Sequence, residues 1–288
     1  MDGTNLLYRA HHALRRSGLT HAGRPIWAVH GLLLTLTKAI EAQQPTHLLV
    51  ALDTPAGCPA RQQQLPQYKS TRDGPPQDLA FQLSWAPDAL TQAGVVAISV
   101  DGWEADDVLA SAAARFAGKV TVVTSDRDAY QLLEDGRVEV YKPDGEVVTD
   151  ASLRDSQQLS PAQYADLAAL RGEASDNIPG VTGVGTVTAT RLLHRFGDLE
   201  AVLAADDSQL RELLGPKTIS NLRTQAGQAR LAKQVGRLRR DLPLGAPTEV
   251  AQLDPGQLVR VLTQVGLPAA GQKLAAALGA GRAAQAAT

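Results

Sequence analysis

Cysteine is nearly absent from this chain, and its scarcity narrows the class of protein. The single Cys58 among 288 residues excludes an internal disulfide framework and a cysteine-rich zinc site. The six histidines are scattered, with only His11 and His12 adjacent, which argues against a histidine metal cluster. We therefore expect a protein of a reducing compartment.

Long apolar runs and an excess of one charge are missing as well. No run approaches the roughly 20 apolar residues that span a bilayer, and no basic-then-apolar signal peptide opens the chain. The formal net charge is -2, so only local charge can indicate a nucleic-acid partner. These absences predict a soluble, cytoplasmic protein with no membrane association.

The apolar segments that are present alternate between strand and helix signals in the first half of the chain. Three short runs rich in β-branched residues are expected strands: 47–52, 95–100 and 119–124. Helical periodicity appears between them at 27–42 and 104–116. This alternation predicts an α/β fold in which a parallel sheet is flanked by crossover helices. A Pro-Asp-Gly turn between 137–141 and 146–149 predicts a small hairpin.

Strand signals disappear from residue 160 onward. Ser160 and Pro161 are an N-cap and a first-turn proline, and they open a series of helices. Further helices are expected at 186–195, 199–204 and 219–238. We therefore divide the chain into an α/β region (1–159), a helical region (160–266) and an Ala/Gly-rich tail (267–288). The composition of the tail predicts disorder after at most one weak helix.

Acidic residues follow each of the three expected strands. They are Asp53 after the first, Glu104, Asp106 and Asp107 after the second, and Asp126 and Asp128 after the third. The carboxyl ends of parallel strands meet at one edge of a sheet, so these side chains are expected to lie close together. Carboxylates without histidine suit Mg²⁺ or Mn²⁺. Two such ions can activate water and stabilise a leaving oxygen in phosphodiester hydrolysis.

Each of these acids also has an ordinary structural interpretation. Glu104, Asp106 and Asp107 open an expected helix, where the helix dipole favours negative charge. The repetition at several strand ends favours the metal site, because clustered carboxylates repel one another without a cation between them. Asp2 would follow a fourth strand, yet only Met1 precedes it. Either a first strand is missing from this start, or the fold does without most of it.

Four segments resemble the motifs of the 5′-3′ exonuclease and flap endonuclease family. They are residues 2–10 (DGTNLLYRA), 104–107 (EADD), 124–128 (TSDRD) and 175–181 (SDNIPGV), in the order and spacing of that family. The resemblance is to the bacterial branch, which includes the amino-terminal nuclease domain of DNA polymerase I, and it extends from residue 1 to about 266. It implies a parallel sheet flanked by helices and a helical arch at about 54–88. It also implies a helix-hairpin-helix module at about 178–196.

The resemblance also implies roles for the acids in holding two Mg²⁺ or Mn²⁺ ions. The positions matching ligands or supports of a first ion are Asp2, Asp53, Glu104, Asp106 and Asp107. Asp126 and Asp128 match ligands shared with, or belonging to, a second ion, and Asp176 matches another ligand of that ion. Glu173 stands where the family usually has Asp, so its carboxylate reaches one methylene further.

The segment after Asp53 carries three basic residues, Arg61, Lys69 and Arg72. Alone it is typical of a solvated basic loop. Its position beyond a strand end lets these cations lie over the acidic edge and hold a scissile phosphate. The Pro-x-Tyr-Lys-x-x-Arg pattern resembles the arch of the family. The resemblance implies that Lys69 and Arg72 contact the phosphate or thread the single strand, and that Arg61 is another arginine of the arch. Tyr68 is placed to stack on an unpaired base.

Residues 180–189 (GVTGVGTVTA) combine closely spaced glycines with a helix start. A bare Gly-x-Gly is more often an ordinary tight turn, although exposed amides at a helix start suit a phosphate. The resemblance implies a helix-hairpin-helix that binds duplex DNA through Gly183, Gly185 and Thr188, with K⁺ held by hairpin carbonyls. Basic residues prevail between 211 and 240 and form a face that can track a duplex.

These observations predict a structure-specific 5′-3′ exonuclease or flap endonuclease that hydrolyses DNA with two metal ions in replication and repair. Its partner is DNA with 5′ flaps or free 5′ ends, and we expect it to be nucleoid-associated. Two alternatives stay open. One is a catalytically impaired relative that still binds branched DNA, and the other is an RNA-cleaving nuclease with a similar acidic site. The sequence does not separate exonuclease from endonuclease action, or a free-standing protein from a fragment.

Overall fold

The computed structural model describes residues 1–285, with side chains through residue 280. Its strands are β1 (Thr20–His21), β2 (Arg24–Pro25), β3 (His47–Leu48), β4 (Val50–Ala51), β5 (Ala97–Ile98), β6 (Val120–Val123), β7 (Val138–Tyr141), β8 (Val147–Val148) and β9 (Thr248–Glu249). β4 pairs in parallel with β5, and β6 pairs in parallel with β7. β7 and β8 form the expected antiparallel hairpin. The expected first strand is split, because β3 pairs with β9 rather than with β5.

The first two residues join the two halves of the sheet. The Ala51 amide donates to the Met1 carbonyl at 2.8 Å, and the Asp2 amide donates to the Val123 carbonyl at 2.9 Å. The Met1 amine donates to the Leu49 carbonyl at 2.9 Å. Met1 and Asp2 therefore occupy the central position between β4 and β6 and are held from both sides.

Both faces of this sheet are buried. Val50 and Leu52 belong to one apolar core, whereas Ala51 between them belongs to another. Val122 and Val123 of β6 divide between the same two cores. Successive side chains of a strand point to opposite faces, so a sheet covered on both sides needs the continuous apolar runs seen in the sequence.

The described chain is rich in helices, and they include the helices expected from the sequence. In chain order the α-helices are α1 (Gly3–Leu14), α2 (Trp27–Gln43), α3 (Pro59–Gln64), α4 (Gln77–Gln92), α5 (Ala105–Arg115), α6 (Asp150–Gln157), α7 (Tyr164–Arg171), α8 (Thr186–Phe196), α9 (Leu199–Ala204), α10 (Asp207–Leu210), α11 (Pro216–Thr224), α12 (Ala226–Gly236), α13 (Pro255–Gln264) and α14 (Pro268–Gln285). The 3-10 helices are η1 (Arg15–Ser17), η2 (Asp128–Leu132), η3 (Pro161–Gln163), η4 (Ala174–Asp176) and η5 (Val250–Gln252). The helix expected at 219–238 is two helices, α11 and α12, which meet at Gln225. None of the described helices is both long and apolar enough to cross a membrane.

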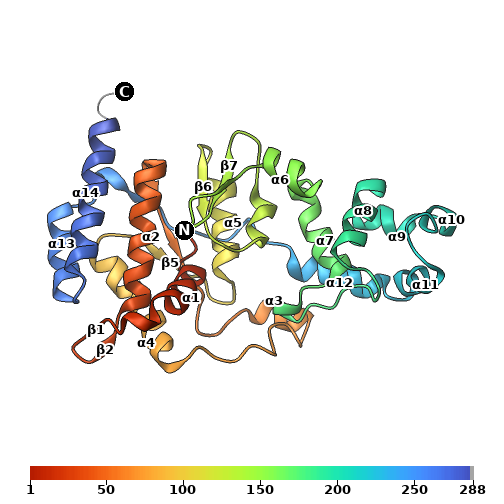
Figure 1. Cartoon of the computed structure of the whole chain (residues 1–288), viewed down its shortest axis with the longest axis horizontal. Helices are drawn as coiled ribbons and strands as arrows, with labels where there is room; N and C mark the ends of the chain where they lie inside the picture. The colour runs from red at the N-terminus through yellow and green to blue at the C-terminus, as the bar shows by residue number, and fades with distance from the viewer. Residues whose placement is uncertain (286–288) are drawn as a thin grey trace.

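The chain forms two lobes, and its end returns to the first of them. Figure 1 shows α7 to α12 as a helical lobe on one side, and α13 and α14 beside α2 on the other. Residues 248–266, which the sequence placed with the helical region, pack on the first lobe, because β9 pairs with β3 and α13 packs against α14 and α4.

The Ala/Gly-rich tail contains the one helix that its composition allowed, and this helix, α14, extends over residues 268–285. Four of its apolar side chains are fully or almost fully buried: Ala270, Leu274, Ala277 and Leu278. Their spacing of four, three and one residues makes a single helical stripe that packs against α2, which the Ala-rich composition concealed. Residues 286–288 lie outside the described part of the chain, so the prediction of disorder is not assessed there.

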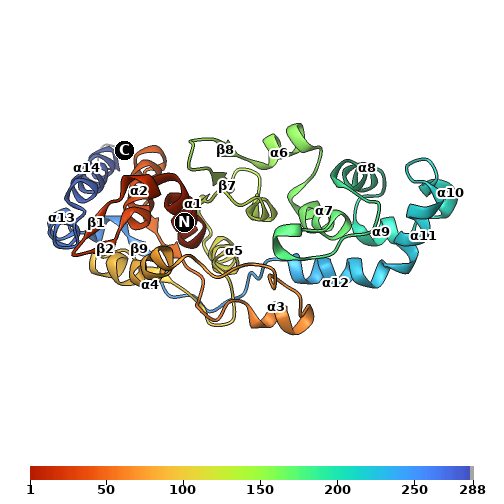
Figure 2. The same cartoon turned by 60° about the horizontal axis from the view of Figure 1, so that its bottom comes forward.

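The predicted arch segment, 54–88, is only partly an arch. It contains the short helix α3 and a turn-rich stretch, which Figure 2 shows running beneath the body toward α4. Much of α4 itself belongs to the core, because Leu79, Ala86 and Ala89 are buried. The exposed connection is thus shorter than predicted and spans roughly the residues between α3 and α4.

Candidate metal centre and substrate cleft

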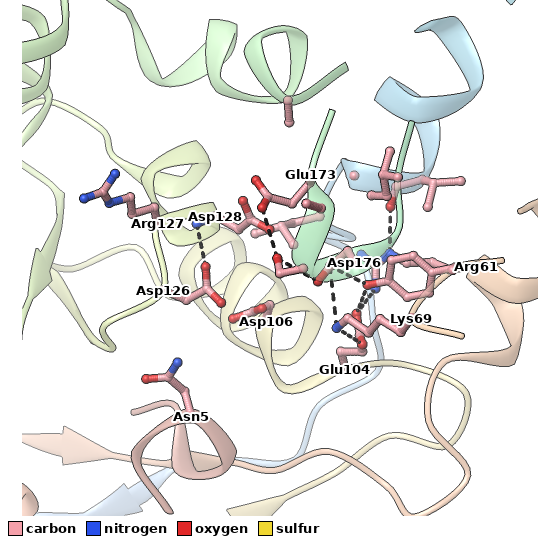
Figure 3. Close-up of a pocket in the computed structure, with 18 of the residues that line it drawn as sticks. Asn5, Arg61, Lys69, Glu104, Asp106, Asp126, Arg127, Asp128, Glu173 and Asp176 are labelled. Atoms are coloured by element: carbon pink, nitrogen blue, oxygen red, sulfur yellow. Dashed lines mark hydrogen bonds and ion pairs between the residues drawn. The ribbon is translucent and has the colours of Figure 1, made fainter. Parts of the chain in front are cut away.

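A cleft of about 1030 Å³ lies at the end of the sheet where the two lobes meet. The acidic residues lining it are Asp2, Asp53, Glu104, Asp106, Asp126, Asp128, Glu173 and Asp176. Eight of the nine predicted metal ligands thus line one hollow, although they come from segments up to 174 residues apart. Figure 3 shows Asp106, Asp126 and Asp128 gathered near one another, with Glu104, Lys69 and Asp176 grouped beside them.

Asp2 is a rigid member of the first group, although it lies at the start of the chain. One carboxylate oxygen caps α1 by accepting from the Asn5 amide at 2.9 Å, and the other accepts from the Thr124 hydroxyl at 2.7 Å. The side chain is almost fully buried. Burial, with the nearby charges of Asp53 and Asp126, raises the pKa of Asp2 to about 7.

Asp106 and Asp128 lie in the same low-dielectric environment. Burial raises the pKa of Asp128 to about 7, and the charges of Asp126 and Asp176 add to the shift. The pKa of Asp106 is raised well above its usual range by burial and then by Asp2 and Asp126. One oxygen of Asp106 is buried with no hydrogen-bond partner among the described residues.

This group of carboxylates fits a divalent cation. A buried oxygen without a partner costs free energy, and neighbouring buried carboxylates resist ionisation together. An ion between them would remove both penalties. The donor set is entirely oxygen and has no histidine, which suits a hard divalent cation.

The second acidic group already has cations, and they come from the arch. Lys69 forms an ion pair with Glu104 and lies 3.7 Å from Asp176, while Arg72 forms an ion pair with Asp176. Burial alone would raise the pKa of Glu104, but Lys69 and Arg61 hold it below its usual value. The base of the arch is thereby fixed to the acids of both lobes.

Backbone contacts strengthen this attachment. The Lys69 amide donates to the Asp176 carbonyl at 2.8 Å, and Lys69 has a left-handed backbone with φ 54°. The Asn177 side chain donates to the Gln67 carbonyl at 2.9 Å and lies 3.1 Å from the Ser70 hydroxyl. The predicted position of Lys69 and Arg72 over the acidic edge is therefore what the structure has.

Arg61 and Asp107 pair with each other at the wall of the cleft. Arg61 is 4% exposed, and its guanidinium donates to both Asp107 oxygens at 2.6 and 2.8 Å and to Glu104 at 2.8 Å. Asp107 is fully buried, does not line the cleft and also accepts from the Arg239 amide at 2.9 Å. The two form an internal ion pair that joins α3, α5 and the segment after α12.

Arg61 also accounts for a second close group of possible ligands. Cys58, Glu104 and Asp107 lie near enough to one another to share a metal ion. The Arg61 guanidinium contacts all three, at 3.5 Å from the Cys58 sulfur. Because a cation already occupies this space, the group is an arginine-binding cluster and not a metal site.

Tyr68 does not have the free ring that base stacking requires. The side chain is 3% exposed, and its hydroxyl lies 2.7 Å from Glu104 and 3.2 Å from Asp176. Burial, together with the charges of Glu104 and Asp176, raises the pKa of the phenol. Tyr68 therefore joins the acids of the two lobes instead of presenting its face to the cleft.

Glu173 and Asp53 lie at the edges of the acidic group. Glu173 forms an ion pair with Arg171 and accepts from the Ser175 hydroxyl at 3.0 Å. Asp53 accepts from the Ala105 amide at 2.7 Å, so it is also held by the start of α5. Both carboxylates line the cleft, with Glu173 oriented by two protein partners and Asp53 by one.

Asn5 and Arg171 are among the polar residues of the cleft that were not singled out from the sequence. Asn5 accepts from the Ser125 hydroxyl at 2.6 Å, which ties α1 to the loop after β6, and Arg171 pairs with Glu173. Asn5 lies within the 2–10 segment that carries the resemblance, so that segment was the available signal. Nothing in the local sequence distinguishes Arg171 from other surface arginines.

The glycine hairpin lies beside this cleft and exposes its first helical turn. Gly183 has a left-handed backbone with φ 90°, and Gly185 is the exposed N-cap of α8 and lines the cleft. Thr188 is partly buried in the first turn of α8. Val187 is 74% exposed at the same turn. The free amides and open surface at this helix start are suited to a phosphate group.

Family models match most of the chain. A model described as 5′-3′ exonuclease, N-terminal resolvase-like domain, covers residues 1–160, and one described as 5′-3′ exonuclease, C-terminal SAM fold, covers residues 159–258. A 5′-3′ exonuclease of Streptomyces coelicolor is 36% identical over 262 residues, covering 85% of this chain and 86% of the relative. The thermostable DNA polymerase I of Thermus aquaticus is 37% identical over 248 residues. That match covers 85% of this chain but only 29% of the polymerase.

Solved structures share the fold at low sequence identity. The T5 D15 protein co-crystallised with metal ions has a TM-score of 0.67 at 19% identity, covering 96% of this chain and 97% of the other. The catalytic core of Rad2 in complex with a DNA substrate has a TM-score of 0.56 at 16% identity, covering 96% and 90%. The predicted fold class, an α/β sheet with flanking helices and a helical lobe, is confirmed.

Proposed function

The chain belongs to the 5′-3′ exonuclease family, and we propose that it hydrolyses phosphodiester bonds in DNA near 5′ flaps or free 5′ ends. The observation that carries this proposal is the group of buried, mutually repelling carboxylates facing the cations of the arch. Such an arrangement offers a binding place for divalent ions and a positive counterpart for a phosphate. The Streptomyces relative is a 5′-3′ exonuclease, and the Rad2 core of similar fold was solved with a DNA substrate, which supports this proposal.

The residues divide into those that would hold metal and those that would hold substrate. Asp2, Asp106, Asp126 and Asp128 would hold one ion, and a second would lie toward Glu173 and Asp176. When bound, Mg²⁺ or Mn²⁺ would supply an activated water and neutralise the developing charge. Lys69 and Arg72 would offset the negative charge of the phosphate and orient it toward the carboxylates.

The glycine hairpin would bind the duplex part of the substrate. The amides at Gly183 and Gly185, with the Thr188 hydroxyl, offer donors to the sugar-phosphate backbone and read no base sequence. Hairpin carbonyls would hold K⁺. A role in replication and repair, on cytoplasmic nucleoid DNA, follows from this substrate class.

Cleavage of a defined branched substrate tests the proposal. Purified protein is incubated with Mg²⁺ or Mn²⁺ and a duplex bearing a 5′ DNA flap, the same duplex with an RNA flap, and plain single-stranded DNA. We expect metal-dependent cleavage of the DNA flap near its junction, and loss of at least about 100-fold in rate for Asp126→Ala. Asp155→Ala, which removes an exposed acid of α6, is the matched control and should cleave normally.

The alternatives give different results in the same experiment. If the wild type binds the flap substrate but cuts none of the three substrates, it is a catalytically impaired protein that binds branched DNA. Preferential cleavage of the RNA flap would favour an RNA-cleaving nuclease. Equal activity of wild type and Asp126→Ala would exclude the proposed metal centre.

A further inference from the structure

A second, smaller hollow lies next to the cleft and has no part in the function proposed above. Its volume is about 370 Å³, and it shares Arg61, Val235 and Leu238 with the wall of the cleft. It is bounded by the end of α3, the loop before α5 and the segment that follows α12. Figure 2 shows α3 against α12 at this place, and the two helices are in contact.

The hollow combines an aromatic ring with arginine side chains. Trp103 is partly buried, and the Arg239 guanidinium lies 4.9 Å from the centre of its ring. Arg239 is held there by both oxygens of Asp241, at 2.8 and 2.9 Å. The ring and the guanidinium are therefore fixed in position before any ligand arrives.

Positive charge at the hollow is not balanced. Asp241 neutralises Arg239, whereas the Arg240 guanidinium donates to the Gln131 carbonyl at 2.6 Å and also interacts with the Glu134 carboxylate. Among the described residues, the exposed Arg237 side chain forms no hydrogen bond or ion pair. The unpaired charge of Arg237 and the nearby Arg240 guanidinium, next to an aromatic ring, are features that hold the phosphate and base of an unpaired nucleotide.

The size and position of the hollow exclude the other parts of a branched substrate. Its volume is at the lower end of the range for small organic ligands and is far too small for a duplex. The glycine hairpin, where a duplex would bind, adjoins the cleft through Gly185, whereas no hairpin residue lines the second hollow. What can reach it from the cleft is a single strand passing the wall formed by Arg61.

We propose that the hollow at Trp103, Arg237 and Arg240 binds a nucleotide of single-stranded DNA, in the 5′ portion of the substrate beyond the cleft. This inference rests on the proposed function, because it needs a DNA strand in the cleft. Arg237 and Arg240 contact the sugar-phosphate backbone, and the Trp103 ring packs against a base. The hollow therefore favours substrates whose 5′ flap is long enough to reach it.

Binding of matched duplexes with and without a flap tests this site. Fluorescence anisotropy is measured with Ca²⁺ in place of Mg²⁺, using a duplex with a 5′ flap of about ten nucleotides and the same duplex with no flap. We expect Arg237→Gln to weaken binding of the flap duplex roughly fivefold and to lower its salt slope by about one, with no change for the flapless duplex. Trp103→Leu should show the same selectivity for the flap duplex.

The control is Arg16→Gln, which removes one exposed, unpaired arginine of η1 that lines neither hollow. If Arg237→Gln and Arg16→Gln weaken binding of both duplexes equally, the effect is a general loss of positive charge, and the proposed nucleotide site is contradicted. No weakening by Arg237→Gln, while the wild type still prefers the flap duplex, would also overturn it and leave the proposed function intact. A wild type that neither binds nor cuts either duplex would remove the proposed function itself.

Discussion

Asp106 and Asp107 are chemically identical neighbours whose surroundings give them opposite tasks. Successive residues of a helix point about 100° apart, so one carboxylate enters the cleft and the other enters the core. Asp106 has a buried oxygen with no partner, whereas Asp107 is matched by Arg61 and by the Arg239 amide. An unpaired buried carboxylate lowers stability, and a binding site retains it because a cation compensates for it.

Asp106→Asn should therefore stabilise the metal-free protein while weakening its response to metal. Removing one charge from the buried group lowers repulsion with Asp2 and Asp126, by about 1 kcal/mol in the free energy of unfolding. Thermal unfolding in EDTA should show a higher Tm than wild type, and added Mn²⁺ should raise it less. Asp155→Asn removes an exposed charge and serves as the control. A lower Tm of Asp106→Asn in EDTA would contradict this account of the carboxylate.

At the scale of elements, two glycines fix the junction between α7 and the glycine hairpin. A Cβ on Gly180 would lie 2.2 Å from the Gly172 nitrogen, and Gly172 itself has φ 80°. The backbones therefore approach too closely for any side chain. This contact sets the direction of the turn that carries Glu173 and Asp176, so it positions acids of the cleft from outside it.

Gly180→Ala should be far more damaging than Gly185→Ala. The first places a methyl group against backbone atoms, which cannot yield as a flexible side chain can, and should cost about 2–3 kcal/mol. The second meets nothing within 4 Å and has an ordinary backbone, so its cost should stay below about 1 kcal/mol. Urea unfolding of both variants measures the difference, and equal midpoints would show that the backbone contact does not hold in solution.

At the scale of the molecule, two apolar cores meet at the sheet whose end carries the acidic cleft. One core combines α1 and α2 with the returning α13 and α14, and the other combines α5 with α7 to α12. Polar contacts connect the arch to this second core and to the cleft. They are made by the Arg61–Asp107 pair and by Tyr68, Lys69 and Arg72. The overall stability therefore depends on the charge state of the cleft.

Metal ions should stabilise the protein more at pH 8 than at pH 5.5. The pKa values of Asp2 and Asp128 are raised to about 7, so between about pH 4 and 7 the folded metal-free protein binds more protons than the unfolded chain. Its stability should accordingly fall as pH rises through that window. A divalent ion binds the ionised carboxylates and offsets the loss only where they are ionised.

Differential scanning fluorimetry with and without Mn²⁺ at the two pH values measures this effect. Each kcal/mol of stabilisation should raise Tm by about 2–4 °C for a chain of this length. NaCl at equal ionic strength controls for general screening. An equal Tm increase at pH 5.5 and pH 8 would show that these carboxylates do not bind the ion.

Local patterns in the sequence were sufficient for the elements and for most of the acidic set. Apolar runs predicted β6 and the regions of β4 and β5, and helical periodicity predicted α2 and α5 with errors of about one residue at their ends. Strand-end positions predicted that Asp53, Asp106 and Asp126 meet at one edge. These features depend on residues a few positions apart and on the direction of parallel strands. Both can be inferred from short segments of sequence.

The tertiary structure alone decided which charges face the cleft and which face each other. Arg61 is buried because the Val235 carbonyl, 174 residues away, accepts from it, and α14 is ordered because α2 covers its apolar stripe. The Tyr68 ring, expected to stack on a base, instead contacts Arg61 and Lys69, while its hydroxyl lies against acids from both lobes. Burial and partners depend on surfaces brought together over long sequence separations. A pattern of residue types therefore identified the acids and bases of this protein, but only packing assigned each one to metal, substrate or scaffold.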